Sequence, residues 1–195
     1  MRLPNVHPPL HAVPARDDAA TDGDSLSAIA NGDRAAFEQL YRRYYERLFR
    51  FCLRVTGRIH LVEDIINETM LVVWRRAAQY RAGAAASTWI FGIAYRKSLK
   101  ALKRDGRARV PTDATSALEP TAPDTLDRED VQAAIRRAVA DLPPEHRAVV
   151  ELTFHSNCSY DEIAQILDCP VGTVKSRMFN ARAKLRPLLA DLLGD

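Results

Sequence analysis

Apolar residues recur at helical spacing along most of the chain, and no segment alternates apolar and polar residues as a surface strand does. From Asp33 to Gly57 this recurrence predicts one long amphipathic helix, with Asp33 as its N-cap and Gly57 as its terminating residue. Further helices are predicted over about residues 61–78 and from Trp89 onward. The pattern therefore predicts an all-α fold.

The C-terminal third of the chain predicts a helix-turn-helix. Ser159 and Glu162 have the spacing of a capping box, which starts a short helix with one apolar face. Residues 168–170 interrupt the periodicity before a second amphipathic helix begins. A helix of this size fits the major groove of DNA, although a solvated helix in a bundle gives the same pattern. The candidate DNA-reading residues of this second helix are Thr173, Lys175, Ser176, Arg177, Phe179 and Asn180.

Two segments without helical periodicity divide the chain. Residues 1–24 are rich in Pro, Ala and Asp and are predicted to form a disordered tail. Residues 111–129 are rich in Pro, Thr, Ala and acidic side chains and are predicted to form a linker. The sequence thus predicts two small helical domains, residues 25–110 and 130–195, joined by a flexible acidic linker, with the helix-turn-helix in the second.

Charge differs strongly between the two halves, although the net charge of the whole chain is only +3. Residues 34–109 carry 17 basic and 6 acidic side chains, whereas residues 110–195 carry 9 and 14. The cations after Trp89 are interrupted only by Asp105 and would repel one another without an anionic partner, which favours nucleic acid. The residues expected to hold DNA phosphates there are Arg96, Lys97, Lys100, Lys103 and Arg104.

One face of the second predicted helix carries Asp64, Asn67 and Glu68, at positions i, i+3 and i+4. Paired carboxylates can perform acid–base chemistry. Nothing nearby in the sequence supplies a nucleophile, a histidine or a metal partner, so we interpret the face as solvated or as docking a partner. No catalytic residue is predicted, and the chain lacks phosphate-cradling glycine loops, His-Glu-x-x-His and serine-elbow motifs.

Cysteine and membrane signals point to the cytoplasm. The chain has three cysteines, an odd number that fits a reducing compartment, and no apolar run reaches the roughly 18 residues of a membrane span. Direct membrane insertion and secretion are therefore not expected. His155, Cys158 and Cys169, with His146 nearby, are the nearest approach to a metal cluster, but they lack a convincing fourth ligand. Neither a metal nor a cofactor is predicted.

The order of these motifs resembles that of a bacterial RNA polymerase sigma factor of the extracytoplasmic-function (ECF) group. LPPEHRAVVEL and YDEIAQILDCPVGTVKSRMFNARAKL are similar to the family's promoter-binding domain. DRAAFEQLYRRYY, VEDIINETMLVVW and STWIFGIAYRKSLK are similar to its first domain. The resemblance covers about residues 33–109 and 131–189, in the family's order and spacing.

The resemblance implies a transcription initiation factor that is not itself an enzyme. It implies that Asp64, Asn67 and Glu68 dock on RNA polymerase core. The loop from Gln79 to Thr88, including Tyr80 and Arg81, would capture a base flipped from the downstream element of promoter DNA. The candidate DNA-reading residues in the second helix of the helix-turn-helix, from Thr173 to Asn180, would read the upstream element.

The resemblance also implies control by an anti-sigma factor, which the sequence does not identify. Two other classes of protein compete with this interpretation. A dimeric helix-turn-helix regulator would bind DNA without core polymerase, and a helical adaptor would bind no DNA. Two separate basic surfaces argue against the adaptor.

Overall fold

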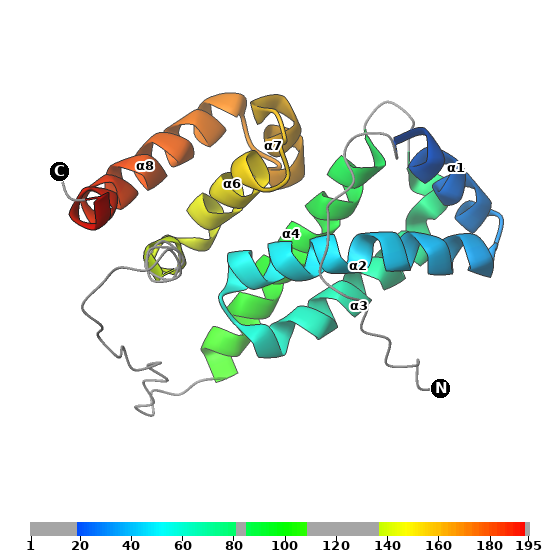
Figure 1. The fold of residues 1–195 in the computed structure, drawn as a ribbon. Coiled ribbons are helices and arrows are strands. Elements are labelled where there is room, and N and C mark those ends of the chain that lie inside the picture. Colours follow the sequence, from blue (N-terminus) through cyan, green and yellow to red (C-terminus); the bar gives the residue numbers. More distant parts are fainter. Residues whose placement is uncertain (1–18, 81–84, 109–136, 194–195) are drawn as a thin grey trace.

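The computed structural model describes residues 19–80, 85–108 and 137–193, and every regular element in these ranges is a helix (Figure 1). The all-α prediction is therefore confirmed for the described residues. The N-terminal unit contains α1 (Ala19–Ala30), α2 (Arg34–Thr56), α3 (Ile59–Arg76), the short 3-10 helix η1 (Ala77–Gln79) and α4 (Ala86–Ala108). The C-terminal unit contains α6 (Pro144–Phe154), α7 (Tyr160–Leu167) and α8 (Val171–Leu193).

Helix α2 begins and ends where its capping residues predict. The Asp33 side chain accepts hydrogen bonds from the backbone N–H groups of Ala35 and Ala36, at 2.8 and 3.0 Å. Gly57 adopts a left-handed φ of 66°, and its N–H donates to the Leu53 carbonyl at 2.7 Å. These local contacts stop the helix and turn the chain into α3.

The structure differs from the predicted disordered tail over residues 1–24, because helix α1 begins at Ala19. Residues 19–24 belong to this helix and not to a disordered segment, while residues 1–18 lie outside the described ranges. Leu26 and Ile29 are fully buried, and α1 contacts α2, α3, η1 and α4. Tertiary burial thus stabilises a helix whose sequence, AATDGDSLSAIA, contains a central glycine and little periodicity.

The connection between α3 and α4 is shorter than predicted. Ala77–Gln79 forms η1, and α4 begins at Ala86 rather than at Trp89. Residues 81–84 of the predicted Gln79–Thr88 loop lie outside the described ranges. Thr88 is buried within the first turn of α4, so residues 86–88 of the predicted loop are helical.

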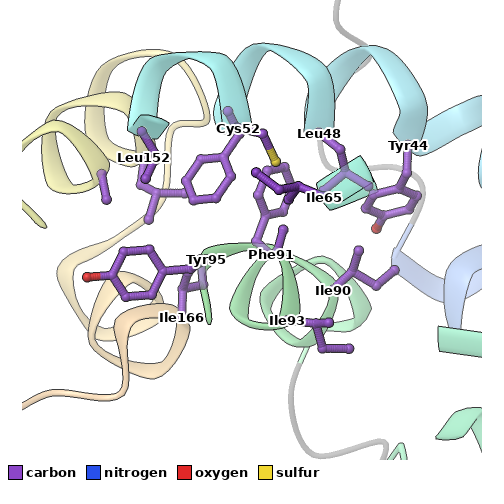
Figure 2. Packing of buried hydrophobic residues seen from close by; sticks show 14 of the residues in the cluster. Tyr44, Leu48, Cys52, Ile65, Ile90, Phe91, Ile93, Tyr95, Leu152 and Ile166 are labelled. Atoms are coloured by element: carbon purple, nitrogen blue, oxygen red, sulfur yellow. The ribbon is translucent and has the colours of Figure 1, made fainter. Parts of the chain in front are cut away.

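One apolar core joins the two units. Phe91 of α4 packs edge-on against Phe51 of α2, with ring centroids 5.1 Å apart. Leu152 of α6 and Ile166 of α7 enter the same cluster beside Tyr95 of α4 (Figure 2). The prediction of two tethered domains did not include this contact, and the predicted linker, residues 111–129, lies outside the described ranges.

Charged side chains cross the same boundary between the units. Arg54 Nε of α2 lies 3.8 Å from Glu151 Oε2 of α6, and His155 Nδ1 lies 3.1 Å from that oxygen. Glu151 is buried, and this burial raises the pKa of its carboxyl to about 7. The contact between the units therefore contains a titratable group as well as apolar side chains.

Candidate nucleic-acid interface

The helix-turn-helix forms as its local sequence dictates. Ser159 caps α7: its hydroxyl accepts from the N–H of Glu162 at 3.3 Å, and its own N–H donates to the Glu162 carboxylate at 2.7 Å. Asp168 ends the helix in the left-handed conformation, with φ 51°. The predicted capping box is confirmed, and the turn after Asp168 sets the direction in which α8 leaves.

Helix α8 divides into a buried side and an exposed side. Val174, Met178 and Ala181 are buried against α6 and α7. The opposite side is consequently exposed, and Phe179 keeps 73% of its surface accessible, which is unusual for a large apolar side chain. The predicted reading residues that share this exposed side are Lys175, Ser176, Phe179 and Asn180; Thr173 is half-buried at its N-terminal edge.

Arg177 is set apart from the other predicted reading residues. Its Nη1 donates to Cys169 Sγ at 3.7 Å, and its positive charge acts on the Tyr95 hydroxyl of α4. Burial raises the pKa of the Tyr95 hydroxyl to about 12 although the nearby Arg177 cation opposes the rise. In this conformation Arg177 is half-buried, with its charge directed toward Tyr95 of the N-terminal unit, and does not lie on the exposed face of α8.

The basic helix α4 carries the second group of predicted DNA contacts. Arg96, Lys100, Lys103 and Arg104 are exposed, whereas Lys97 is half-buried. Near the C-terminal end of α4, Asp105 contacts the guanidinium of Arg58 and lies 3.4 Å from His60 Nε2. The single acid in the basic run is thus used to fix the end of α4 to the turn between α2 and α3 and does not neutralise the neighbouring cations.

Tyr80 lies at the junction between η1 and the start of α4. Its ring packs against Trp89, with centroids 5.7 Å apart, and both side chains are half-buried. Burial raises the pKa of the Tyr80 hydroxyl, and the negative charge of Asp22 in α1 adds to the rise. Arg81, the other residue predicted in this loop, lies outside the described ranges.

The predicted docking residues lie on α3. Asp64 and Asn67 are exposed, and Asn67 Oδ1 accepts a hydrogen bond from the Tyr41 hydroxyl at 3.1 Å. Glu68 is only half-buried, but its Oε2 lies 2.8 Å from Lys97 Nζ. That hydrogen bond is the main reason why the pKa of Glu68 lies below its usual value.

An open apolar groove lies beside Asn67, one of the predicted docking residues, and sequence reasoning missed it. The groove measures about 430 Å³. Phe37 and Trp74 recur at helical spacing with the other apolar residues of α2 and α3, a pattern typical of core positions, but the structure leaves both half-buried at the wall of the groove. The exposed Leu71, which lies outside the periodic apolar set of α3, was the available signal. The residues lining the groove are Arg34, Phe37, Tyr41, Asn67, Met70, Leu71 and Trp74.

The candidate metal residues are not assembled into a site. Among the described residues, no group of three His, Cys, Asp or Glu side chains has the arrangement needed to hold a metal ion. Cys158 donates weakly to the Ser156 carbonyl and Cys169 accepts from Arg177, while His155 contacts Glu151. None of the helices within the described ranges is long and apolar enough to cross a membrane.

Family models match both units of the chain. The model for Sigma-70 region 2 matches residues 40–108, which include most of α2 and all of α3 and α4. The model for Sigma-70, region 4 matches residues 132–185, which include α6, α7 and the exposed polar side of α8. Both candidate DNA-binding surfaces therefore lie within matched segments.

Curated relatives match nearly the whole chain. The ECF RNA polymerase sigma factor SigM of Mycobacterium tuberculosis is 35% identical over 88% of this chain and 86% of its own. The ECF RNA polymerase sigma-E factor of Haemophilus influenzae is 30% identical over 87% and 97%, respectively. The RNA polymerase sigma-H factor of Pseudomonas aeruginosa is 27% identical over 89% and 96%.

Solved structures share the fold. CnrH, solved in complex with the cytosolic domain of CnrY, gives a TM-score of 0.64 at 23% identity, over 87% of this chain and 97% of the other. The sigma factor RpoE of Bartonella quintana, solved in complex with the anti-sigma factor NepR, gives 0.61 at 25% identity, over 78% and 96%. Both similarities extend across the N-terminal and C-terminal units.

Proposed function

This chain belongs to the ECF group of RNA polymerase sigma factors, and from that premise we propose how its two helical units divide promoter recognition between them. As a sigma factor it binds RNA polymerase core and directs the polymerase to initiate transcription at specific promoters. It acts in the cytoplasm, where the polymerase is, and is not an enzyme in its own right. The observation that carries the division of labour is the presence of two separate basic surfaces, on α4 and α8.

The C-terminal unit, residues 130–195, reads the upstream promoter element. The exposed side of α8 combines a cation, a hydroxyl, an amide and an aromatic ring within two turns of helix. Lys175 and Ser176 reach phosphates or base edges, Asn180 can pair with adenine, and Phe179 can contact a thymine methyl group. Arg177 joins this surface only if its hydrogen bond with Cys169 is released, because the guanidinium otherwise points away from the exposed face.

The N-terminal unit, residues 25–110 together with the preceding turns of α1, engages the downstream element. Arg96, Lys100, Lys103 and Arg104 are exposed on α4 and hold duplex and displaced strand by their phosphates. Tyr80 and Arg81 belong to the segment that receives a base flipped from the duplex. Flipping costs a few kcal/mol, which contacts with the basic helix help to supply.

RNA polymerase core docks on α3 through Asp64, Asn67 and Glu68. Asn67 lines the apolar groove between α2 and α3, whereas Asp64 and Glu68 line the crevice between α3 and α4. The proposed docking surface therefore combines polar groups with exposed apolar area. Leu71 and Trp74 supply the apolar contribution. Burial of such area is the main favourable term in most protein association, and the polar residues fix the orientation of the partner.

An anti-sigma factor is the proposed negative regulator. Support comes from RpoE of Bartonella quintana, which was solved in complex with the anti-sigma factor NepR and has the fold seen here. The contact between the N-terminal and C-terminal units of this chain supplies a compact form on which such a partner can act.

Run-off transcription with purified core polymerase tests the proposed function. Reactions with and without this protein, on a fragmented genomic library, are expected to differ by new transcripts whose start sites share an upstream motif. Core binding without new transcripts would contradict the initiation role and indicate an inhibitor or adaptor. Specific DNA binding without core binding would instead indicate a helix-turn-helix regulator.

A further inference from the structure

Asp22 of α1 is a buried carboxylate to which the proposed function assigns no role. Its residue surface is 2% exposed. Tyr44, also buried, donates its hydroxyl to Asp22 Oδ2 at 2.5 Å, and the adjacent Arg43 pairs with Asp22 Oδ1. Two consecutive residues of α2 therefore hold one side chain of α1.

A charged group at this position has a cost that an apolar residue would avoid. Burying a carboxylate removes its hydration, and its partners often return little more than that loss. A leucine in the same space would fix α1 by packing alone, as Leu26 and Ile29 already do further along the helix. The Asp22 contacts define the position of α1 on α2 more narrowly than apolar packing does, because hydrogen bonds to two donors are directional.

The position of α1 matters because of what else it contacts. Helix α1 lies at the end of the bundle where α3 ends and α4 begins, and it packs against η1 (Figure 1). Tyr80 follows η1 directly, and its N–H donates to the Ala77 carbonyl at 3.0 Å. Ala77 is itself buried, so a shift of α1 is passed through η1 to Tyr80. The Asp22 charge also acts on the Tyr80 hydroxyl, whose pKa it helps to raise.

We propose that Asp22 is a positioning residue for recognition of the downstream promoter element: by fixing α1 to Arg43 and Tyr44, it holds η1 and sets where Tyr80 meets the displaced DNA strand. The inference rests on the role proposed above for Tyr80. Asp22 itself does not contact DNA. Asp22 affects which base the protein prefers in the downstream promoter element. The binding of core polymerase by α3 does not require Asp22.

The test uses the full-length protein with core polymerase and a promoter found by the run-off experiment. Two versions of that promoter are compared, one native and one with a substituted base in the downstream element. The ratio of initiation from the two is the readout. A partly unfolded population lowers both rates equally, so a merely structural role of Asp22 would leave the ratio unchanged.

The Asp22→Asn variant is expected to reduce this ratio by roughly tenfold, the scale of discrimination at one base pair, with core affinity within about twofold of native. Asp24→Asn, on the same helix but exposed, is the matched control and is expected to keep the native ratio. The double variant Asp22→Asn/Arg43→Gln restores a neutral hydrogen-bonded pair and is expected to recover most of the discrimination. A native ratio in Asp22→Asn would overturn the proposal.

A second variant keeps the proposal testable if Asp22→Asn does not fold. Tyr44→Phe retains the buried ring and the contact between Asp22 and Arg43 and removes only the hydroxyl donor. A smaller loss of discrimination is expected, and a native ratio in this folded variant would overturn the proposal. If the native protein itself yields no core-dependent transcripts, the proposed function fails; if it discriminates and Asp22→Asn does so equally well, only the role of Asp22 fails.

Discussion

Lys97 Nζ of α4 lies 2.8 Å from Glu68 Oε2 of α3, so a residue proposed to hold DNA forms an ion pair with a residue proposed to dock on polymerase. Asp64, Lys100 and Arg104 line the same narrow crevice. The two proposed surfaces therefore meet along one line between α3 and α4. A partner that pairs with Glu68 would remove this carboxylate from its ion pair with Lys97.

Replacing Lys97 by Met is expected to return the pKa of Glu68 toward its ordinary value, because the hydrogen bond from Lys97 is the largest cause of its depression. The free energy of unfolding is expected to fall by at most about 1 kcal/mol, since partly exposed ion pairs contribute little. NMR titration of Glu68 and urea denaturation measure the two effects. Lys103→Met, which removes an exposed cation from the same helix, should leave the Glu68 titration unchanged.

Replacing Asn180 by Ala is expected to change which upstream sequences are used, whereas replacing Lys100 by Ala should weaken promoter engagement at all sequences alike. The reason is that base edges carry sequence information and phosphates do not. Loss of one phosphate contact should also reduce the slope of log affinity against log salt by about 0.9. Equal effects of both substitutions across a promoter library would contradict the division between α8 and α4.

Replacing Gly57 by Ala is expected to destabilise the protein by about 1–2 kcal/mol. The residue has a left-handed φ of 66°, and an added Cβ would lie 2.9 Å from Arg147 Nη1. Gly106→Ala is the control, because that glycine is exposed within α4 and nothing lies within 4 Å of an added Cβ. The control is expected to raise stability by about 0.5–1 kcal/mol through helix propensity. Urea denaturation of both variants provides the comparison.

Glu151 is expected to make stability fall as pH rises. Its folded pKa of about 7 lies above the ordinary value of 4.5 because burial disfavours the charged form. The folded state therefore binds the proton more tightly than the unfolded state. The resulting stabilisation is fully present below about pH 4.5 and is lost as the pH rises through about 7, a change of roughly 3 kcal/mol at most.

Glu151→Gln removes this titration. The native protein should lose stability relative to the variant between about pH 5 and about pH 8, as followed by urea denaturation at each pH. Arg54 and Arg50 lower the carboxyl pKa and so limit the effect. The lowered pKa of His155 acts in the opposite direction, with stability lost as pH falls. Because His155 contacts the Glu151 carboxylate, the difference between native and variant reports the titration of this pair. A constant difference between native and variant would contradict the expected contribution of Glu151.

Local signals in the sequence predicted the helices whose ends are fixed by nearby residues. Asp33, Gly57 and the Ser159–Glu162 pair act on backbone groups within four residues of themselves, so their effect can be read without the fold. Helix α1 gives no such signal, since its N-terminal half is held by contacts to Arg43 and Tyr44 far along the chain. It was therefore assigned in part to a disordered tail.

The candidate site shows the same division. Lys175, Phe179 and Asn180 were predicted together because helical spacing alone places them on one side of α8. Arg177 shares that helix, yet its side chain bonds to Cys169 and its charge acts on Tyr95 of the other unit, and only the packed structure brings these groups together. The groove beside Leu71 was missed because exposure of Phe37 and Trp74 depends on which helices cover them.

The sequence by itself determined the helical periods, the caps, the distribution of charge and the motifs by which the family is recognised, because each of these depends on residues close together in the chain. Only the tertiary structure decided that the two units share a core, that Glu151 is buried beside Arg54, and that Asp22 fixes α1 next to Tyr80. Those relationships join segments far apart in sequence. Their energies come from burial and desolvation, which depend on every element packed around them.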